Sequence, residues 1–275
     1  MTIKRKWINI LAAFIFCLFL FLHFDGYEIF IFQDSTLPKG YSFQLDQPFE
    51  EIVMKANDGA TIHGLLLKTK NHPKGIFLYF HGNRNNLSRW AHECAYLTNY
   101  GYEVFVVDYR GYGKSTGLRN EENFYADAYL AYQHCKLYFP TEKIIAYGRS
   151  LGTGPACWLA ANANLQALVL ETPYTQFTDL IEQKMLGFPM RWFLDYRFNN
   201  LQQLKNIEEP VLIVHGTRDK LIPISHGQTL SKVCKHPYSN LVVVEGGDHN
   251  NLPTYQTYKD GLKVFLEKAA LNSPQ

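Results

Sequence analysis

The pentapeptide Gly-Arg-Ser-Leu-Gly at residues 148–152 constrains the fold of this chain more than any other feature. It directly follows an apolar run at 144–147 and precedes a helix-favouring stretch at 155–161. A serine with glycine two residues before and two residues after it fits a tight strand-to-helix turn, because the absent side chains leave room for the bend. Such a turn exposes the serine hydroxyl at the end of the strand. Ser150 is therefore a candidate nucleophile, and its surroundings predict an α/β fold.

A nucleophile of this kind needs an acid and then a histidine further along the chain, each in a loop that follows a strand. Asp219 follows the apolar run 210–216, and His249 lies in a glycine-rich loop after the run 241–245. The sequence thus predicts a catalytic triad of Ser150, Asp219 and His249, in which the histidine accepts the serine proton and the aspartate orients the imidazole. Two alternatives for the acid remain, namely Glu171 at a strand end and Asp248 beside the histidine.

An oxyanion hole would supply hydrogen-bond donors to the negative charge of a tetrahedral intermediate. One expected donor is the backbone amide of Leu151, directly after the nucleophile, and the other is that of Asn83, in the loop after the apolar run 75–80. His81 and His215 each precede a glycine at a strand end, and we expect them to support loops. Arg149 is expected to be anchored to a carboxylate behind the turn.

Apolar runs and helix-favouring stretches alternate through residues 46–275. Two β-rich runs around an Asp-Gly turn at 58–59 predict an antiparallel hairpin, and the later strands are separated by helical stretches. This pattern is typical of a mostly parallel eight-stranded sheet flanked by helices. The expected strands are 51–55, 61–67, 76–80, 104–107, 144–147, 167–170, 211–214 and 241–244, and the expected helices are 87–99, 121–138, 153–163, 175–186, 225–234 and 254–270.

The segment 173–209 between two predicted strands is long enough to form a small helical cap. It is rich in large apolar side chains, which would suit an acyl chain, since each buried methylene contributes about 0.8 kcal/mol. Ordinary packing of a helix on the sheet would explain the same composition. Both interpretations remain open from the sequence.

Residues 7–24 form an almost unbroken apolar run behind Lys4, Arg5 and Lys6. A helix of this length spans roughly 27 Å, close to the hydrocarbon thickness of a bilayer. Bulky residues continue to its end without a small-residue cleavage site, which favours a retained transmembrane signal anchor over a cleaved signal peptide. The positive charges place residues 1–6 in the cytoplasm and the catalytic domain on the extracytoplasmic side. Residues 25–45 are then a connector, expected at the membrane interface or against the domain.

Composition narrows the expected partners. With 275 residues and 47% hydrophobic content, the chain can bury one sizeable core. A net charge of +2 gives no cationic excess of the kind that a nucleic-acid surface needs, so nucleic acid is not an expected partner. The widely spaced cysteines of the domain favour buried free thiols over disulfides, and we expect neither a metal nor a cofactor. These cysteines are Cys94, Cys135, Cys157 and Cys234.

Three stretches resemble the membrane-anchored α/β-hydrolase-domain proteins, a group that includes protein depalmitoylases and lysophospholipid or monoacylglycerol lipases. They are DYRGYGKS at 108–115, YGRSLGTG at 147–154 and RFNNL at 197–201. The resemblance covers about residues 46–268. It implies an α/β-hydrolase fold and a membrane-anchored serine hydrolase of the esterase, lipase or thioesterase type. One departure is the polar, cationic sequence Arg84-Asn85-Asn86 beside the predicted oxyanion hole.

The expected reaction is cleavage of a carboxylic ester or thioester through an acyl-enzyme. The expected substrate is a small-molecule ester, an acylated lipid or an acylated protein. Two alternatives stay open, a peptidase on the same fold and a non-enzymatic module that binds a hydrophobic ligand. An intact triad disfavours the second of these.

Overall fold

The computed structural model describes residue 7 and residues 28–185, 187 and 190–271. The predicted transmembrane anchor at 7–24 therefore lies, except for Trp7, outside the described residues. Among the residues that are described, no helix is both long and apolar enough to cross a membrane.

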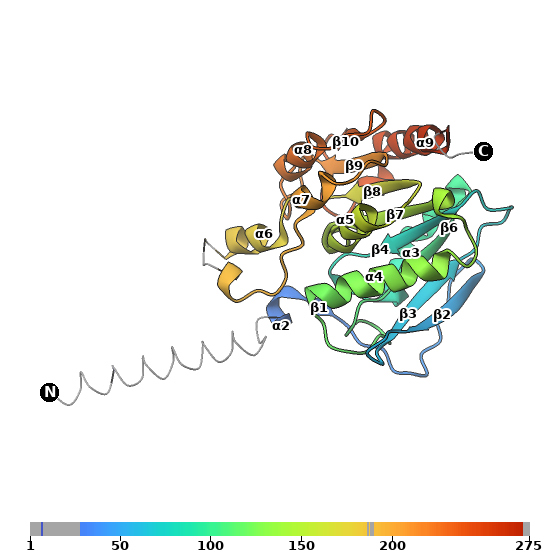
Figure 1. Ribbon diagram of the computed structural model, residues 1–275, viewed down its shortest axis with the longest axis horizontal. Helices are drawn as coiled ribbons and strands as arrows, with labels where there is room; N and C mark the ends of the chain where they lie inside the picture. Colours follow the sequence, from blue (N-terminus) through green and yellow to red (C-terminus); the bar gives the residue numbers. More distant parts are fainter. Residues whose placement is uncertain (1–6, 8–27, 186, 188–189, 272–275) are drawn as a thin grey trace.

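Eight strands form a single sheet in the order β10-β9-β8-β7-β4-β6-β3-β2 (Figure 1). The pairs β2–β3 and β3–β6 are antiparallel, and all other neighbours are parallel. This confirms the predicted mostly parallel sheet with an antiparallel opening. The strands are β2 Phe49–Lys55, β3 Thr61–Leu67, β4 Ile76–Phe80, β6 Glu103–Val107, β7 Ile144–Arg149, β8 Ala167–Glu171, β9 Val211–Gly216 and β10 Asn240–Val244.

Both faces of the sheet are buried under helices. The helices α4 (Glu121–Cys135) and α5 (Thr153–Asn162) lie in front of the sheet in Figure 1. Leu78 of β4 belongs to one hydrophobic cluster together with side chains of these two helices. Its neighbour Phe77 belongs to the other cluster, with side chains of α3 (Leu87–Cys94) and α9 (Gln256–Leu271). Because alternate residues of a strand point to opposite faces, a strand buried on both sides is an unbroken apolar run.

The parallel strands all end at the same edge of the sheet. Asn83 follows β4, Ser150 follows β7, Asp219 follows β9, and His249 follows β10. In open α/β sheets ligands bind outside the carboxyl ends of the strands, which is where these four residues gather.

The segment 173–209 contains α6 (Phe177–Lys184), a short 3₁₀ turn at Met190–Trp192 and α7 (Asn200–Leu204). In Figure 1 it projects on the left. Phe177, Met190 and Phe198 are buried in the main hydrophobic cluster, while Trp192 is 78% exposed. Most of the large apolar side chains described in this segment therefore stabilise the domain by ordinary packing.

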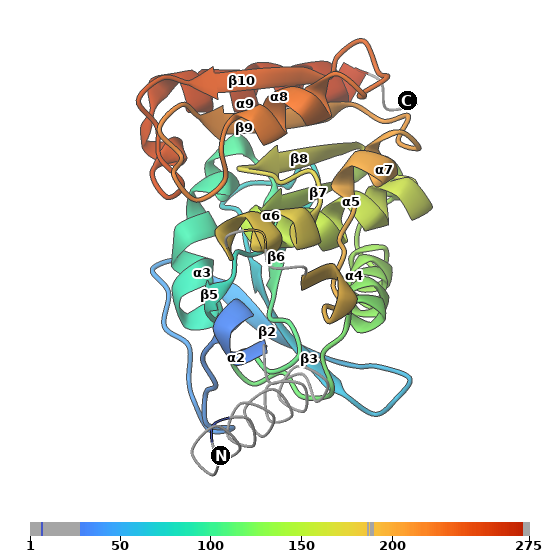
Figure 2. The same cartoon turned by 90° about the vertical axis from the view of Figure 1, so that its left-hand side faces the viewer.

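Residues 28–37, which we call the strap, lie against the domain. The strap holds α2 (Glu28–Ile31) and the short strand β1 (Gln33–Asp34), which pairs in parallel with β5 (Arg84–Asn85). Figure 2 shows α2 beside β5 and α3. Phe32 is buried, with ring centroids 4.7 Å from Tyr196 and 6.4 Å from Phe177. Part of the predicted connector is thus a wall of the domain.

Candidate active site

The turn at Ser150 requires glycine on both sides of the serine. Ser150 has a φ of 52°, in the left-handed region, as the chain passes from β7 into a 3₁₀ turn at Ser150–Gly152. A Cβ atom on Gly148 would lie 2.5 Å from the carbonyl oxygen of Gly152, and one on Gly152 would lie 2.0 Å from that of Phe80. Any larger residue at 148 or 152 would have to displace backbone.

The structure brings Ser150, Asp219 and His249 together in one hydrogen-bonded line. Asp219 Oδ1 accepts the backbone amides of Leu221 and Ile222 at 2.9 and 2.8 Å, while Oδ2 lies 2.8 Å from His249 Nδ1. A carboxylate in this position accepts, so Nδ1 carries the imidazole proton. His249 Nε2 then presents a lone pair to Ser150 Oγ, 3.0 Å away. This is the geometry that general-base activation of a serine needs.

The environment of Asp219 favours its ionised form. Burial alone would raise the pKa of this carboxyl, but the adjacent His215, the hydrogen bond from His249 and the amide of Ile222 outweigh burial and hold the pKa well below its ordinary value. His215 Nε2 lies 3.6 Å from Asp219 Oδ2. The carboxylate is therefore charged at neutral pH.

Within the described residues, neither alternative acid forms a hydrogen bond with the His249 imidazole. Glu171 is fully buried; its carboxylate accepts the hydroxyl of Tyr147 and lies 3.2 Å from the Nε atom of Arg149. Asp248 is exposed, and its Oδ1 accepts the backbone amide of Asn250 at 2.8 Å. Asp219 is the carboxylate that the fold places on the imidazole.

Arg149 lies behind the serine and is almost fully buried. Besides Glu171, it pairs with Glu93, whose Oε2 lies 3.3 Å from Nη1, so the expected anchoring to a carboxylate is observed. Its Nη2 donates to the backbone and side-chain oxygens of Asn250, both at 3.4 Å. Because Asn250 adjoins His249, Arg149 ties the histidine loop to the turn that holds the serine.

The two histidines expected to support loops do so. His81 Nδ1 lies 2.7 Å from the carbonyl oxygen of Gly82, and Nε2 lies 3.1 Å from Asp108 Oδ1. His215 Nε2 donates to the carbonyl of Ile222 at 2.8 Å. Both imidazoles are fully buried, and neither contacts Ser150 within the described structure.

The two residues expected to supply the oxyanion donors both lie close to the serine. The Leu151 amide directly follows it at the start of the helical segment, and Asn83 lines the same cleft as Ser150. The Asn83 side chain is held on three sides: Oδ1 accepts the Tyr112 hydroxyl at 2.8 Å and the Gln33 amide at 3.2 Å, and Nδ2 donates to the Ile31 carbonyl. No acceptor in the described part of the chain bonds the Asn83 backbone N–H.

A cleft of about 410 Å³ opens in front of the serine hydroxyl. Its walls include three arginines and no aspartate or glutamate among the described residues. The Trp90 ring stacks with two of these arginines, with Arg89 Cζ 5.5 Å and Arg149 Cζ 5.1 Å from its centroid. The lining residues are Gln33, Gly82, Asn83, Arg84, Arg89, Trp90, Arg149, Ser150, Leu221, His249 and Asn250.

The segment 173–209 contributes no wall to this cleft among its described residues. Its described helices, α6 and α7, pack on the domain, which favours packing over an acyl lid as the reason for its described apolar side chains. Five wall residues were not predicted from the sequence, namely Gln33, Arg89, Trp90, Leu221 and Asn250. Asn250 could have been predicted as a wall residue because it directly follows His249 in the sequence. Nothing in the local sequence of Gln33 indicates that the strap reaches the cleft.

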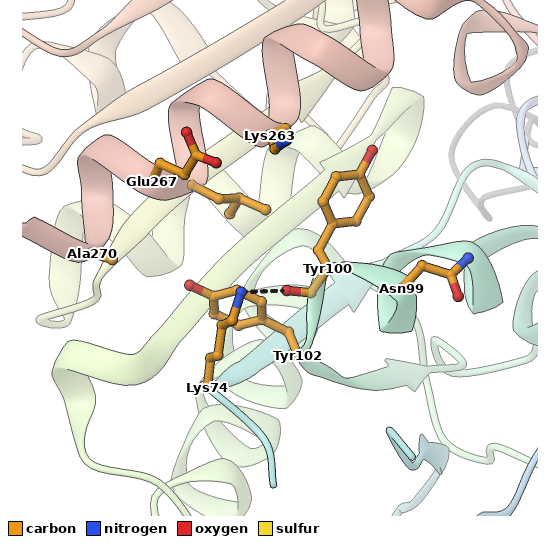
Figure 3. Close-up of a pocket in the computed structure, with 8 residues that line it drawn as sticks. Lys74, Asn99, Tyr100, Tyr102, Lys263, Glu267 and Ala270 are labelled. Atoms are coloured by element: carbon orange, nitrogen blue, oxygen red, sulfur yellow. Dashed lines mark hydrogen bonds between the residues drawn. The ribbon is translucent and has the colours of Figure 1, made fainter. Parts of the chain in front are cut away.

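A second cavity, of about 540 Å³, lies elsewhere on the domain. It is formed at the amino end of β4 and along α9, on the opposite edge of the sheet from Ser150. Lys74 Nζ donates to the Tyr100 carbonyl at 3.2 Å, and Figure 3 marks this hydrogen bond among the lining residues. None of the predicted site residues lines this cavity. No group of three or more metal-ligating side chains is found in the described ranges of the chain.

The described cysteines are all free thiols. Cys94, Cys135 and Cys157 are fully buried and Cys234 is half-buried. Burial raises the pKa of Cys234 to about 11. None of these thiols lines the cleft at Ser150.

Comparisons with known proteins agree with this architecture. A family model described as serine aminopeptidase S33 matches residues 71–203. The human α/β hydrolase domain-containing protein 17B is 31% identical over 237 residues, which cover 84% of this chain and 80% of the relative. The Caenorhabditis elegans α/β hydrolase domain-containing protein aho-3 is 35% identical over 202 residues, covering 70% and 58% of the two chains.

Among solved structures, the Pyrococcus furiosus esterase Pf2001 superposes with a TM-score of 0.67 at 18% identity, covering 87% of this chain and 99% of the esterase. The Butyrivibrio proteoclasticus protein Est1E, solved with ferulic acid bound, superposes with a TM-score of 0.64 at 18% identity, covering 81% and 98%. At this level of identity the two structures establish the shared fold.

Proposed function

The chain belongs to the α/β-hydrolase superfamily, among the α/β hydrolase domain-containing proteins, and on this premise we propose that it is a membrane-anchored serine hydrolase that cleaves carboxylic ester or thioester bonds. The observation that carries the proposal is the line from Asp219 through His249 to Ser150, with hydrogen-bond distances of 2.8 and 3.0 Å. A serine hydrolase of esterase-like architecture is what the family and fold both indicate.

In the proposed mechanism, His249 Nε2 accepts the proton of Ser150 as Oγ attacks the carbonyl carbon. Asp219 keeps the Nδ1 proton in place and stabilises the imidazolium that forms. The imidazolium then donates its proton to the leaving oxygen or sulfur, and the acyl group stays on Oγ. Water, deprotonated by His249, attacks the acyl-enzyme and releases the acid.

The tetrahedral intermediates carry a negative oxygen, and we assign its stabilisation to the amides of Leu151 and Asn83. The Asn83 N–H bonds no acceptor among the described residues, which supports this assignment, since a donor for a transition-state charge must be free in the resting enzyme. Each such donor contributes about 2.7–4 kcal/mol of transition-state stabilisation. The Asn83 side-chain contacts hold the donor in position without occupying it.

A second candidate, an aminopeptidase, is suggested by the description of the matching family model. An enzyme that binds a free amino terminus needs an anion near the nucleophile to pair with the substrate ammonium. The cleft instead has three arginines in its walls and no carboxylate among the described residues. This charge favours the ester or thioester substrate over the peptide.

The finer parts of the proposal concern the membrane and the acyl group. The apolar run 7–24 behind three basic residues supports a single-pass anchor, with the amino terminus in the cytoplasm and the catalytic domain on the extracytoplasmic side. An enzyme anchored in this way meets acylated or lipid-like substrates at the bilayer surface, and we propose these as its substrates.

Hydrolysis of p-nitrophenyl esters from acetate to palmitate by the detergent-solubilised full chain tests the proposal. We expect turnover of at least one ester, and its loss in Ser150→Ala without a change in melting temperature. A rate that rises with acyl length would support a lipid-like substrate. Equal turnover by Ser150→Ala, or no turnover of any ester by the wild type, would refute the proposed function.

A further inference from the structure

Three arginines line the cleft at Ser150, and in the described part of the chain two carboxylates pair with them. Arg89 Nη2 lies 3.3 Å from Glu93 Oε1, and Arg149 pairs with the same Glu93 and with Glu171. Within the described part of the chain no carboxylate pairs with Arg84, whose side chain is exposed and lines the cleft. One positive charge therefore faces the cleft without an internal partner.

The backbone that carries Arg84 is fixed on two sides. Arg84 stands opposite Gln33 in the β1–β5 pair, so the strap supports it from one side. On the other side its carbonyl accepts the indole N–H of Trp90 at 2.5 Å. A cationic side chain on a fixed backbone loses less conformational freedom when it binds a ligand than one on a loose loop would.

The surroundings of Arg84 suit an oxyacid group. Its planar guanidinium presents paired N–H donors that match the oxygens of a carboxylate or a phosphate. The side-chain amides of Gln33 and Asn250 line the same cleft, and no described cleft residue is acidic. A cleft with one sign of charge raises the local concentration of ligands of the opposite sign.

We propose that Arg84 is the charged element of an anion-binding subsite beside Ser150, and that the enzyme prefers esters or thioesters that carry a carboxylate or phosphate group. This inference rests on the proposed function, because it assigns a substrate class to the same nucleophile. It gives a role to Arg84, the cationic residue in the departure from the resembling group at 84–86.

Matched substrate pairs test the proposal on the full chain. Methyl 4-butyryloxybenzoate is neutral, 4-butyryloxybenzoate carries a carboxylate, and 4-butyryloxyphenyl phosphate carries a phosphate, all on the leaving group. The pair of p-nitrophenyl hexanoate and mono-p-nitrophenyl adipate places the charge on the acyl group. For each pair, the ratio of kcat/KM for the anionic substrate to that for the neutral one is compared between wild type and Arg84→Gln.

The control variant is Arg197→Gln, which removes one positive charge from an exposed residue outside the cleft. We expect Arg84→Gln to lower the charge ratio of at least one pair by about two- to fivefold, the range of an exposed ion pair, and the effect to shrink in 0.5 M salt. Arg197→Gln should leave the ratios unchanged. Unchanged ratios for every pair in Arg84→Gln, or an equal fall in Arg197→Gln, would overturn the subsite.

A binding measurement separates this inference from the proposed function. In the Ser150→Ala background, calorimetry should show tighter binding of 4-hydroxybenzoate than of its methyl ester, and adding Arg84→Gln should remove the difference. Equal affinities before that second change would refute the subsite even if esters are hydrolysed. Conversely, an Arg84-dependent preference together with no ester hydrolysis would overturn only the proposed function.

Discussion

Two histidine–aspartate pairs lie at the same edge of the sheet and differ in what the second imidazole nitrogen meets. In the pair His249–Asp219, the free nitrogen faces the hydroxyl of Ser150, and the histidine side chain is 12% exposed at the cleft. In the pair His81–Asp108, the second nitrogen lies 2.7 Å from the Gly82 carbonyl, and both side chains are fully buried. The same two residue types therefore make a candidate base in one place and a rigid support in the other.

The two pairs also differ in where their protons lie. Asp219 accepts two backbone amides at Oδ1, and its pKa is held low despite burial, so His249 Nδ1 donates to it. Burial raises the pKa of Asp108, although its hydrogen bond with His81 opposes this rise. Since His81 Nδ1 must donate to a carbonyl, the second pair shares one proton between Nε2 and the carboxyl. A catalytic base needs an acceptor free for the substrate, and only His249 has one.

The largest expected effect is on kcat, and it should differ between substitutions of His249 and of His81. His249→Gln removes the base, so kcat for ester hydrolysis should fall by a factor on the order of 10⁴–10⁶, with the melting temperature nearly unchanged. His81→Gln should retain kcat per folded molecule and lose about 2–3 kcal/mol of stability, because it opens a packed site against Trp90 and Tyr109. A catalytic loss in His81→Gln as large as that in His249→Gln would remove the distinction.

The two aspartates give the next contrast. Asp219→Asn cannot accept from His249 in the same way and favours the wrong tautomer, so kcat should fall about 10⁴-fold. Asp108→Asn can donate to His81 Nε2 while its oxygen accepts the Leu87 amide, so it should cost less than about 1.5 kcal/mol of stability and retain activity. Steady-state kinetics and thermal unfolding of both variants measure this. A strongly destabilised Asp108→Asn would show that Asp108 is ionised.

The pH dependence of stability should have opposite signs for the two carboxyls. The folded-state pKa of Asp219 is lowered, so its contribution is present above the unfolded value of about 3.9 and is lost as the pH falls toward the folded value. The pKa of Asp108 is raised, so its contribution is present below about 3.9 and is lost as the pH rises toward its folded value.

Melting temperatures of wild type, Asp219→Asn and Asp108→Asn between pH 3 and 6 test this opposition. As the pH falls below 4, the melting temperature of Asp219→Asn should decrease less than that of wild type. As the pH rises above 4, the melting temperature of Asp108→Asn should decrease less than that of wild type. One titrating group changes the free energy of unfolding by at most about 1.4 kcal/mol per pH unit. Parallel curves for the three proteins would contradict the assignment.

The smallest expected effect is on stability alone, and it comes from a substitution beside the buried pair His81–Asp108. The buried hydroxyl of Tyr109 donates to the His81 carbonyl at 2.6 Å, and neither residue lines the cleft. Tyr109→Phe should therefore cost about 1 kcal/mol of stability and leave kcat unchanged. A fall in kcat with full stability would mean that the buried pair acts on the active site, and would weaken the comparison.

The sequence predicted the sheet because its strands are buried on both faces and stand out as apolar runs between helices. The helical stretch expected at 87–99 is confirmed, although it is α-helical only to Cys94 and then continues as a 3₁₀ helix, Ala95–Tyr100, that ends at Gly101 with a φ of 87°. The two-residue strands β1 and β5 were not predicted, since such short pairings carry no periodic signal.

Within the candidate site, Ser150, Asp219 and His249 were predictable because each follows a strand whose end lies at the same edge. Gln33 was not, because its place in the cleft depends on the strap folding back along Asn83 and Arg84. The distinction between His81 and His249 could be anticipated only from their order along the chain. The hydrogen-bond partner of the second imidazole nitrogen in each histidine became known only from the structure.

The most direct test of the central claim is to map where a fluorophosphonate probe reacts on the full chain, and how fast. Mass spectrometry should find the adduct on Ser150, with the labelling rate reduced at least a hundredfold in His249→Gln and unchanged in folded His81→Gln. An adduct on another residue, or labelling of Ser150 at the wild-type rate without His249, would contradict the account.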